Sequence, residues 1–211
     1  MAWAPDYCTT AELKSFLRIT DTADDAELGF AITAASKAID RVANRQFGVT
    51  TAEARQYSWC GEYIYGRPAL KVDDIMTTTG LIVKVDLTND GVYEQTLTLT
   101  TDYVMYPRNN PDKSLPWTHI LLTPTAVAYF PAFEAGTEVT AAYGWTTVPT
   151  TIKDACLLQA SRFFSRRNSP YGIAGSPEFG TELRLLERLD PDVRLMVLTY
   201  KRQWGAVGYV S

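Results

Sequence analysis

The chain has 211 residues, of which 46% are hydrophobic and 21% charged, a composition typical of a folded globular protein with one or two domains. Its formal net charge of −4 is unevenly spread, because residues 1–150 carry eleven Lys/Arg against eighteen Asp/Glu, whereas residues 151–211 carry nine against six. The acidic body argues against non-specific nucleic-acid binding, and no apolar run approaches the roughly twenty residues of a membrane-spanning helix.

The first part of the chain, residues 1–48, is predicted to be helical. Thr9, followed three residues later by Glu12, fits a capping box that opens a short helix. A second helix, capped by Asp21 or Thr22 and ending near Phe47, is indicated by apolar residues at spacings of four and three: Leu28, Ile32, Ala35, Ile39 and Val42. This amphipathic stripe predicts helix-to-helix packing.

Residues 49–149 change to the alternating pattern of β-strands. Strands are indicated over residues 81–87, 93–99, 103–106, 119–122 and 138–143, with two more around 56–65. Asn89-Asp90-Gly91 is a strong hairpin signal between the first two of these runs, and residues 107–116 are expected to form a polar loop. We therefore predict an α+β protein in which a small antiparallel sandwich or barrel is inserted between helical parts.

Residues 150–211 are predicted to be helical again and to form one helical domain with residues 1–48. A helix from about Thr151 to Arg167 is apolar nearly all round, so it must be covered by its own domain or by neighbouring subunits. An irregular Gly/Pro-rich segment is expected over residues 168–180, then a short helix from Thr181 to Leu189. Asp190-Pro191 predicts the start of a last helix that ends near Trp204, before an arm over residues 205–211.

Residues suited to catalysis are sparse. The single histidine, His119, lies in a strand-like run, and Cys8, Cys60 and Cys156 are too widely spaced for a zinc site or a disulfide framework. No phosphate-binding glycine motif is present, so the sequence predicts neither an enzyme nor a bound cofactor or metal, and it favours a reducing cytoplasm as the place of synthesis.

Two other functions stay open. A metal-dependent hydrolase would need the carboxylates of Asp73, Asp74 and Asp102 to converge, although adjacent residues on one element point apart. A carbohydrate-binding or host-adhesion module would use aromatic rings exposed in the β-rich part, for which the candidates are Trp59, Tyr63, Tyr65 and Trp117.

Three segments together resemble the head-tail connector (adaptor) proteins of long-tailed bacteriophages. They are TTAELKSFLRITDTADDAELGFAITAASKAIDRVANRQF at residues 9–47, YGWTTVPTTIKDACLLQASRFFSRRNSPYG at residues 143–172 and GTELRLLERLDPDVRLMVLTYKR at residues 180–202. The resemblance implies a structural virion protein, made in a bacterial host, that forms a ring expected to be twelve-fold. This ring would lie between the portal protein and the stopper or tail-completion protein and line the DNA exit path.

The resemblance also implies which residues meet partners. Docking on the portal would involve Tyr200, Lys201, Arg202 and Trp204 with the arm that follows. Arg166, Arg167 and Tyr171 would lie at contacts with the portal or a neighbouring subunit. Read without the resemblance, Arg166 and Arg167 also suit the negative end of a helix.

Overall fold

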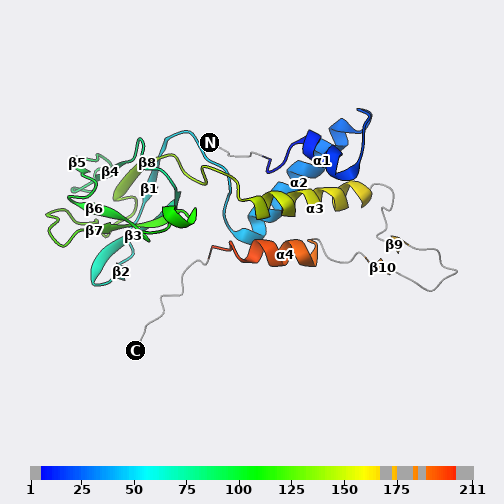
Figure 1. Ribbon diagram of the computed structural model, residues 1–211. Coiled ribbons are helices and arrows are strands. Elements are labelled where there is room, and N and C mark those ends of the chain that lie inside the picture. The colour runs from blue at the N-terminus through cyan, green and yellow to red at the C-terminus, as the bar shows by residue number, and fades with distance from the viewer. Residues whose placement is uncertain (1–5, 167–172, 175–182, 185–188, 203–211) are drawn as a thin grey trace. The chain divides into compact units, whose positions relative to one another are not determined.

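A computed structural model describes residues 6–166, 173–174, 183–184 and 189–202. The chain forms two compact units, one of Met1–Phe47 with Val148–Ser211 and the other of Gly48–Thr147, here called the helical unit and the β unit. Their elements are labelled in Figure 1. Among the described residues no helix is long and apolar enough to cross a membrane. The mixed α+β architecture predicted from the sequence is confirmed.

The helical unit contains α1 (Thr10–Leu17), α2 (Asp25–Ala43), α3 (Thr150–Ser165) and α4 (Pro191–Leu198). The predicted capping box of α1 is confirmed: the Glu12 backbone N–H donates to the Thr9 hydroxyl at 3.2 Å, and the Thr9 N–H donates to the Glu12 carboxylate at 2.8 Å. The predicted bounds of α2 are wrong at both ends. Asp24 holds the N-cap position, and the helix ends where Asn44 turns into the left-handed region.

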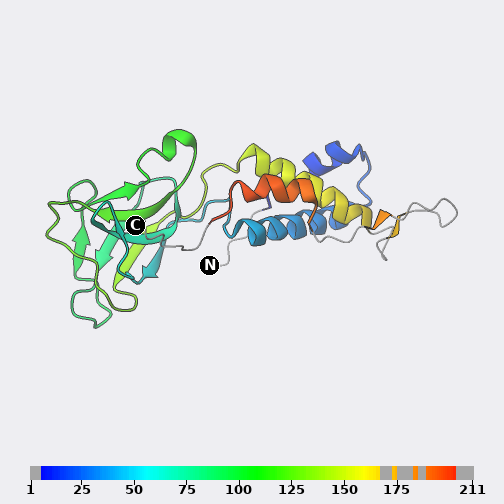
Figure 2. The same ribbon diagram turned by 90° about the horizontal axis from the view of Figure 1, so that it is seen from below.

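The core of the helical unit is the apolar stripe of α2 packed against α3 and α4. Figures 1 and 2 show these three helices alongside one another. From α2 the stripe buries Leu28, Ile32, Ala35 and Ile39, while α3 and α4 contribute Ile152, Ala155, Ala160, Val193 and Val197. Away from the face that packs on α2, α3 is only half-buried at Leu157, Leu158 and Phe164. The unit therefore leaves part of this unusually apolar helix accessible.

The C-terminal elements agree only in part with the sequence prediction. The start of α4 is confirmed, because the Asp190 carboxylate accepts the Asp192 N–H at 2.9 Å and Pro191 occupies the first turn. The helix ends at Leu198, short of the predicted Trp204. Where a loop and then a helix were predicted, β9 (Ile173–Ala174) pairs with β10 (Leu183–Arg184). A short apolar run fits a strand as well as a helix, so spacing alone could not decide.

The β unit is an antiparallel sandwich. One sheet has the order β1-β8-β4-β5 and the other β2-β3-β7-β6. The strands are β1 (Glu53–Tyr57), β2 (Tyr63–Ile64), β3 (Arg67–Ile75), β4 (Ile82–Val85), β5 (Gln95–Leu97), β6 (Tyr103–Tyr106), β7 (Trp117–Leu122) and β8 (Thr137–Ala141). Both sheets contribute to one apolar cluster, which includes Leu70, Val83, Tyr103, Ile120 and Val139. The predicted antiparallel insertion is confirmed.

Two details of the β unit differ from the prediction. The longest strand, β3, was missed because Pro68, Asp73 and Asp74 make its sequence look like a turn. The hairpin of β4 and β5 is confirmed, but a longer loop over residues 86–94 connects the strands. Asp86 organises that loop by accepting backbone N–H groups at 2.7–2.9 Å.

The chain enters and leaves the β unit through adjacent backbone segments. Val49 and Gly144 form an antiparallel bridge, and the Trp145 N–H donates to the Gly48 carbonyl at 2.9 Å. Gly144 has φ +104°, and a Cβ placed there would lie 1.8 Å from the Gly48 oxygen. Only glycine permits this approach of the two segments.

Candidate partner-binding site

The helical unit contains a groove bordered by α2, α3 and α4. Two cavities of about 620 and 450 Å³ adjoin, because both are lined by Arg41, Val42 and Leu189. The floor is apolar and consists of Ala34, Ala38, Val42, Phe163, Leu189 and Leu198. The rim carries five cations, Lys37, Arg41, Arg166, Arg194 and Lys201, and we call the whole feature the basic groove.

The sequence of α2 explains how the groove arises. Residues 34, 37, 38, 41 and 42 follow one another at spacings of three and one, which places them on a single helix face. The small side chains of Ala34 and Ala38 leave space above the backbone, and Lys37 and Arg41 stand beside that space. Arg41 also lies in the last turn of α2, where the helix dipole favours positive charge.

The rim charges are largely available for a ligand. Arg41, Arg194 and Lys201 are exposed and make no ion pair with any carboxylate in the described part of the chain. No Asp or Glu is among the described residues that line the groove. The carboxylate of Asp40 on α2 is instead engaged by the Tyr7 hydroxyl and, at 3.6 Å, by Lys37. An apolar floor beside the exposed cations Arg41, Arg194 and Lys201 suits an amphipathic segment that carries negative charge.

Two residues predicted to meet partners line this groove. Arg166 follows α3, with its guanidinium carbon 5.9 Å from the centre of the Phe163 ring. Lys201 follows α4, and its side chain is exposed. Arg41 and Arg194 join them, and sequence reasoning missed both, because Arg41 lies more than a hundred residues before the other three.

The other residues predicted to meet partners do not line the groove in the described part of the chain. The Tyr200 ring packs edge-on against Phe47 with ring centres 5.7 Å apart. Arg202 is 7% exposed, and its backbone N–H donates to the Ala43 carbonyl at 2.8 Å, which fixes the chain beyond α4 to the end of α2. Arg167, Tyr171 and Trp204 lie outside the described residues.

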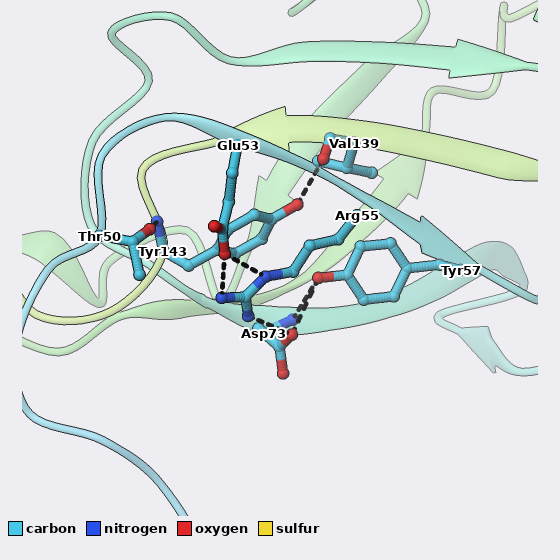
Figure 3. Close-up of polar contacts among 7 residues, drawn as sticks. All are labelled: Thr50, Glu53, Arg55, Tyr57, Asp73, Val139 and Tyr143. Carbon is cyan, nitrogen blue, oxygen red and sulfur yellow. Dashed lines mark hydrogen bonds and ion pairs between the residues drawn. The ribbon is translucent and has the colours of Figure 1, made fainter. Parts of the chain in front are cut away.

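The β unit contains a dense polar cluster, shown in Figure 3, whose groups are bonded to one another. Arg55 donates to Asp73 at 2.8 Å and to Glu53 at 2.9 Å, and its guanidinium carbon lies 4.0 Å from the centre of the Tyr143 ring. The Tyr57 hydroxyl donates to Asp73 at 3.0 Å. Burial raises the pKa of Tyr143 to about 12, so this phenol stays neutral at physiological pH. These contacts tie β1 to β3 and to the segment that follows β8, so the cluster has a structural role.

The carboxylates considered for a hydrolase also accept hydrogen bonds from groups within the β unit. Asp74 is buried and accepts the Trp145 indole N–H at 3.2 Å, while Asp102 accepts the Thr98 N–H at 2.7 Å. Among the described residues, only Asp86, Asp90 and Glu94 form an acidic group compact enough for a cation. Burial alone would raise the pKa of Asp86, but backbone N–H donors outweigh it and hold the pKa below its ordinary value. This bonding organises the loop without requiring an ion.

The histidine has local partners as well. The Nε2 atom of His119 lies 3.5 Å from a Glu62 oxygen, and its Nδ1 atom lies 2.9 Å from the Thr118 hydroxyl. The ring is half-buried in β7 and stacks edge-on with Tyr106 at 6.3 Å. These contacts are typical of a structural side chain.

Comparison with known proteins finds solved structures of similar fold. No protein-family model and no curated protein sequence matches the chain. Among solved structures, a chain from the neck of an empty GTA particle computed with C6 symmetry is 18% identical, with a TM-score of 0.56 over 99% of this chain and 96% of that chain. A chain from the neck of a native GTA particle computed with C12 symmetry is 18% identical, with a TM-score of 0.53 over 99% and 96%.

A third similar chain comes from the virion of a native gene transfer agent (GTA) particle. It is 21% identical, with a TM-score of 0.53 over 96% of this chain and 93% of that chain. All three alignments cover nearly the full length on both sides, so the likeness includes the helical unit and the β unit together. The protein has the fold of chains found in the necks and virions of gene transfer agent particles.

Proposed function

We propose that this protein is a structural component of the neck of a phage-type particle, where it acts as a head-tail connector. The observation that carries the proposal is the full-length fold likeness to chains from particle necks. Those necks were computed with C6 and C12 symmetry, which supports a ring, and we propose twelve copies. In this role the ring joins a portal protein to a stopper or tail-completion protein and surrounds the path of the DNA.

Two surfaces of the helical unit suit such an assembly. The half-buried side of α3, at Leu157, Leu158 and Phe164, offers apolar area for a neighbouring subunit. The basic groove offers an apolar floor and the exposed cations Arg41, Arg194 and Lys201 for a negatively charged segment of the portal protein. We assign Lys201 to this second contact, with Tyr200 and Trp204 as further docking residues that the buried Arg202 helps to position. We assign Arg166, Arg167 and Tyr171 to contacts with the portal or a neighbouring subunit.

The test combines light scattering with negative-stain microscopy on the full chain, alone and mixed with the portal protein encoded in the same genome. We expect rings alone or rings assembled on the portal. A chain that stays monomeric and does not bind the portal contradicts the connector function. A truncation after Arg202 removes the arm while keeping α4 and the Arg202–Ala43 hydrogen bond, and it is expected to weaken portal binding.

Charge reversal tests the groove separately. The double variant Arg41→Glu/Arg194→Glu changes two exposed cations that have no ion pair in the described residues, so the fold should be retained. We expect portal binding to fall at least about tenfold. Arg18→Glu, an exposed cation elsewhere in the helical unit, is the matched control and should bind like the unmodified chain. Equal binding by all three proteins would show that the groove does not contact the portal. Ring assembly is tested separately, by the microscopy described above.

A further inference from the structure

A second cavity, in the β unit, has the features of a small-ligand site. It has a volume of about 370 Å³, within the usual size range of ligand pockets. The turn between β2 and β3, the strand β6 and the loop that follows β6 form its walls. The side chains that bear on its chemistry are Tyr65, Arg67, Tyr106, Arg108, Asn109 and Lys113, and we call it the tyrosine pocket.

The pocket is basic within an acidic unit. Residues 48–147 carry six Lys/Arg against eleven Asp/Glu, yet three of those six cations, Arg67, Arg108 and Lys113, line this one cavity. No Asp or Glu is among the described residues that line it. Arg108 and Lys113 are exposed and make no ion pair in the described part of the chain. Like charges held together in this way repel one another, which a bound anion relieves.

Arg67 adds a charge whose position is fixed. Its Nε atom donates to the Leu122 carbonyl at 2.6 Å, which holds the guanidinium at the wall of the pocket. Its Nη2 atom is buried and has no hydrogen-bond acceptor among the described residues. An arginine remains charged at any physiological pH, so this side chain presents an uncompensated positive charge beside the cavity.

Two tyrosines supply an apolar surface next to these cations. Tyr65 is 84% exposed at the tip of the β2–β3 turn, where its backbone has φ +51°. Its ring meets the Tyr106 ring edge-on, with ring centres 6.1 Å apart. An exposed aromatic face presents apolar area with little conformational freedom to lose on binding, which suits the C–H face of a sugar ring. The exposed amide of Asn109 adds polar hydrogen-bonding capacity.

The size of the pocket and the charge around it limit the class of ligand that can bind. A long polyanion such as DNA would extend beyond the pocket onto a unit that carries five more acidic than basic residues. A compact ligand with one carboxylate avoids that repulsion while meeting the cations. We propose that the tyrosine pocket binds an acidic sugar, with its ring against Tyr65 and its carboxylate toward Arg67, Arg108 and Lys113. This site is independent of the basic groove and of the connector function.

The test is calorimetric titration of the full chain with a tetrasaccharide that alternates glucuronic acid and N-acetylglucosamine. We expect saturable binding with a Kd at or below about 1 mM, the range of a weak single site. The carboxyl-reduced form of the same tetrasaccharide should bind at least about tenfold more weakly. Equal binding of the neutral form, or no binding at millimolar concentration, would overturn the proposal. So would equal affinity for a short oligoglutamate peptide or for an oligothymidylate of similar charge.

Variants assign the binding to this pocket. Arg108→Gln/Lys113→Gln removes two exposed charges without touching the core, and we expect at least a tenfold loss of affinity. Tyr65→Asn removes the ring but keeps a residue that tolerates positive φ, and it should weaken both forms of the sugar. Lys84→Gln, on β4 and outside the pocket, is the matched control. Unchanged affinity in the double variant would refute the assignment.

Discussion

The close approach of Gly144 to Gly48 gives a sharp prediction for stability. Gly144→Ala would place a Cβ 1.8 Å from the Gly48 oxygen and 2.9 Å from the Gly48 carbonyl carbon, so the backbone must move. That oxygen accepts the Trp145 backbone N–H, and the Gly144 N–H donates to the backbone carbonyl of Asp74 at 2.6 Å. Disturbing these bonds costs about 0.5–1.5 kcal/mol each. Alanine at φ +104° adds about 1–3 kcal/mol of backbone strain. We therefore expect a loss of about 2–6 kcal/mol in the free energy of unfolding of the β unit.

Urea titration followed by circular dichroism measures this loss, and Gly80→Ala is the control. Gly80 also has positive φ, +73°, but a Cβ there would meet no atom within 4 Å. The control thus carries backbone strain without a clash, and it should lose only about 1–2 kcal/mol. If both variants lose the same amount, the close approach of the two backbone segments contributes nothing and the reasoning fails.

Two further predictions concern buried groups. Burial raises the pKa of Tyr103 and Tyr143 to about 12 in the folded protein. Above pH 10 these tyrosines therefore lose their protons in the unfolded chain before they do so in the folded one. The free energy of unfolding should then fall by about 1.4 kcal/mol per pH unit for each tyrosine. Urea midpoints measured between pH 9 and 12 check this: Tyr103→Phe should make the fall shallower, and no fall below pH 11 would contradict it. Among the thiols, Cys60 is exposed, whereas Cys8 and Cys156 are buried with their sulfurs 3.4 Å apart. A thiol reagent should therefore label one cysteine rapidly in the native protein and all three in urea, and rapid labelling of Cys60→Ser would contradict the buried pair.

Local signals predicted the elements that depend on local chemistry. The capping box at Thr9, the Asp190-Pro191 helix start and the strand Tyr103–Tyr106 each follow from a few adjacent residues. The strand β3 escaped prediction because its acidic residues are satisfied by distant partners. Asp73 is bonded by Arg55 and Tyr57, and Asp74 by Trp145. A sequence pattern cannot show such pairing before the fold is known.

The basic groove shows that a functional site, too, can escape prediction from the sequence. Arg166 and Lys201 were identified from a resemblance in the chain segments around them. Arg41 and Arg194 looked like ordinary solvated charges, since each follows the helical periodicity of its own element. Only the packing of α2 against α3 and α4 brings them around a common hollow with an apolar floor. The tyrosine pocket likewise combines residues from β3 and the loop after β6.

The hydrogen bond between Gly48 and Trp145 bears on how the chain acquired and folds its β unit. Because the backbone returns to within 2.9 Å of its point of departure, the inserted residues act on their host as a short, closed connection between α2 and α3. Once the insertion has folded, the helices that flank it no longer have to close a loop of about a hundred flexible residues. Segments with joined ends of this kind can be gained, enlarged or replaced while the surrounding helices keep their sequence and packing.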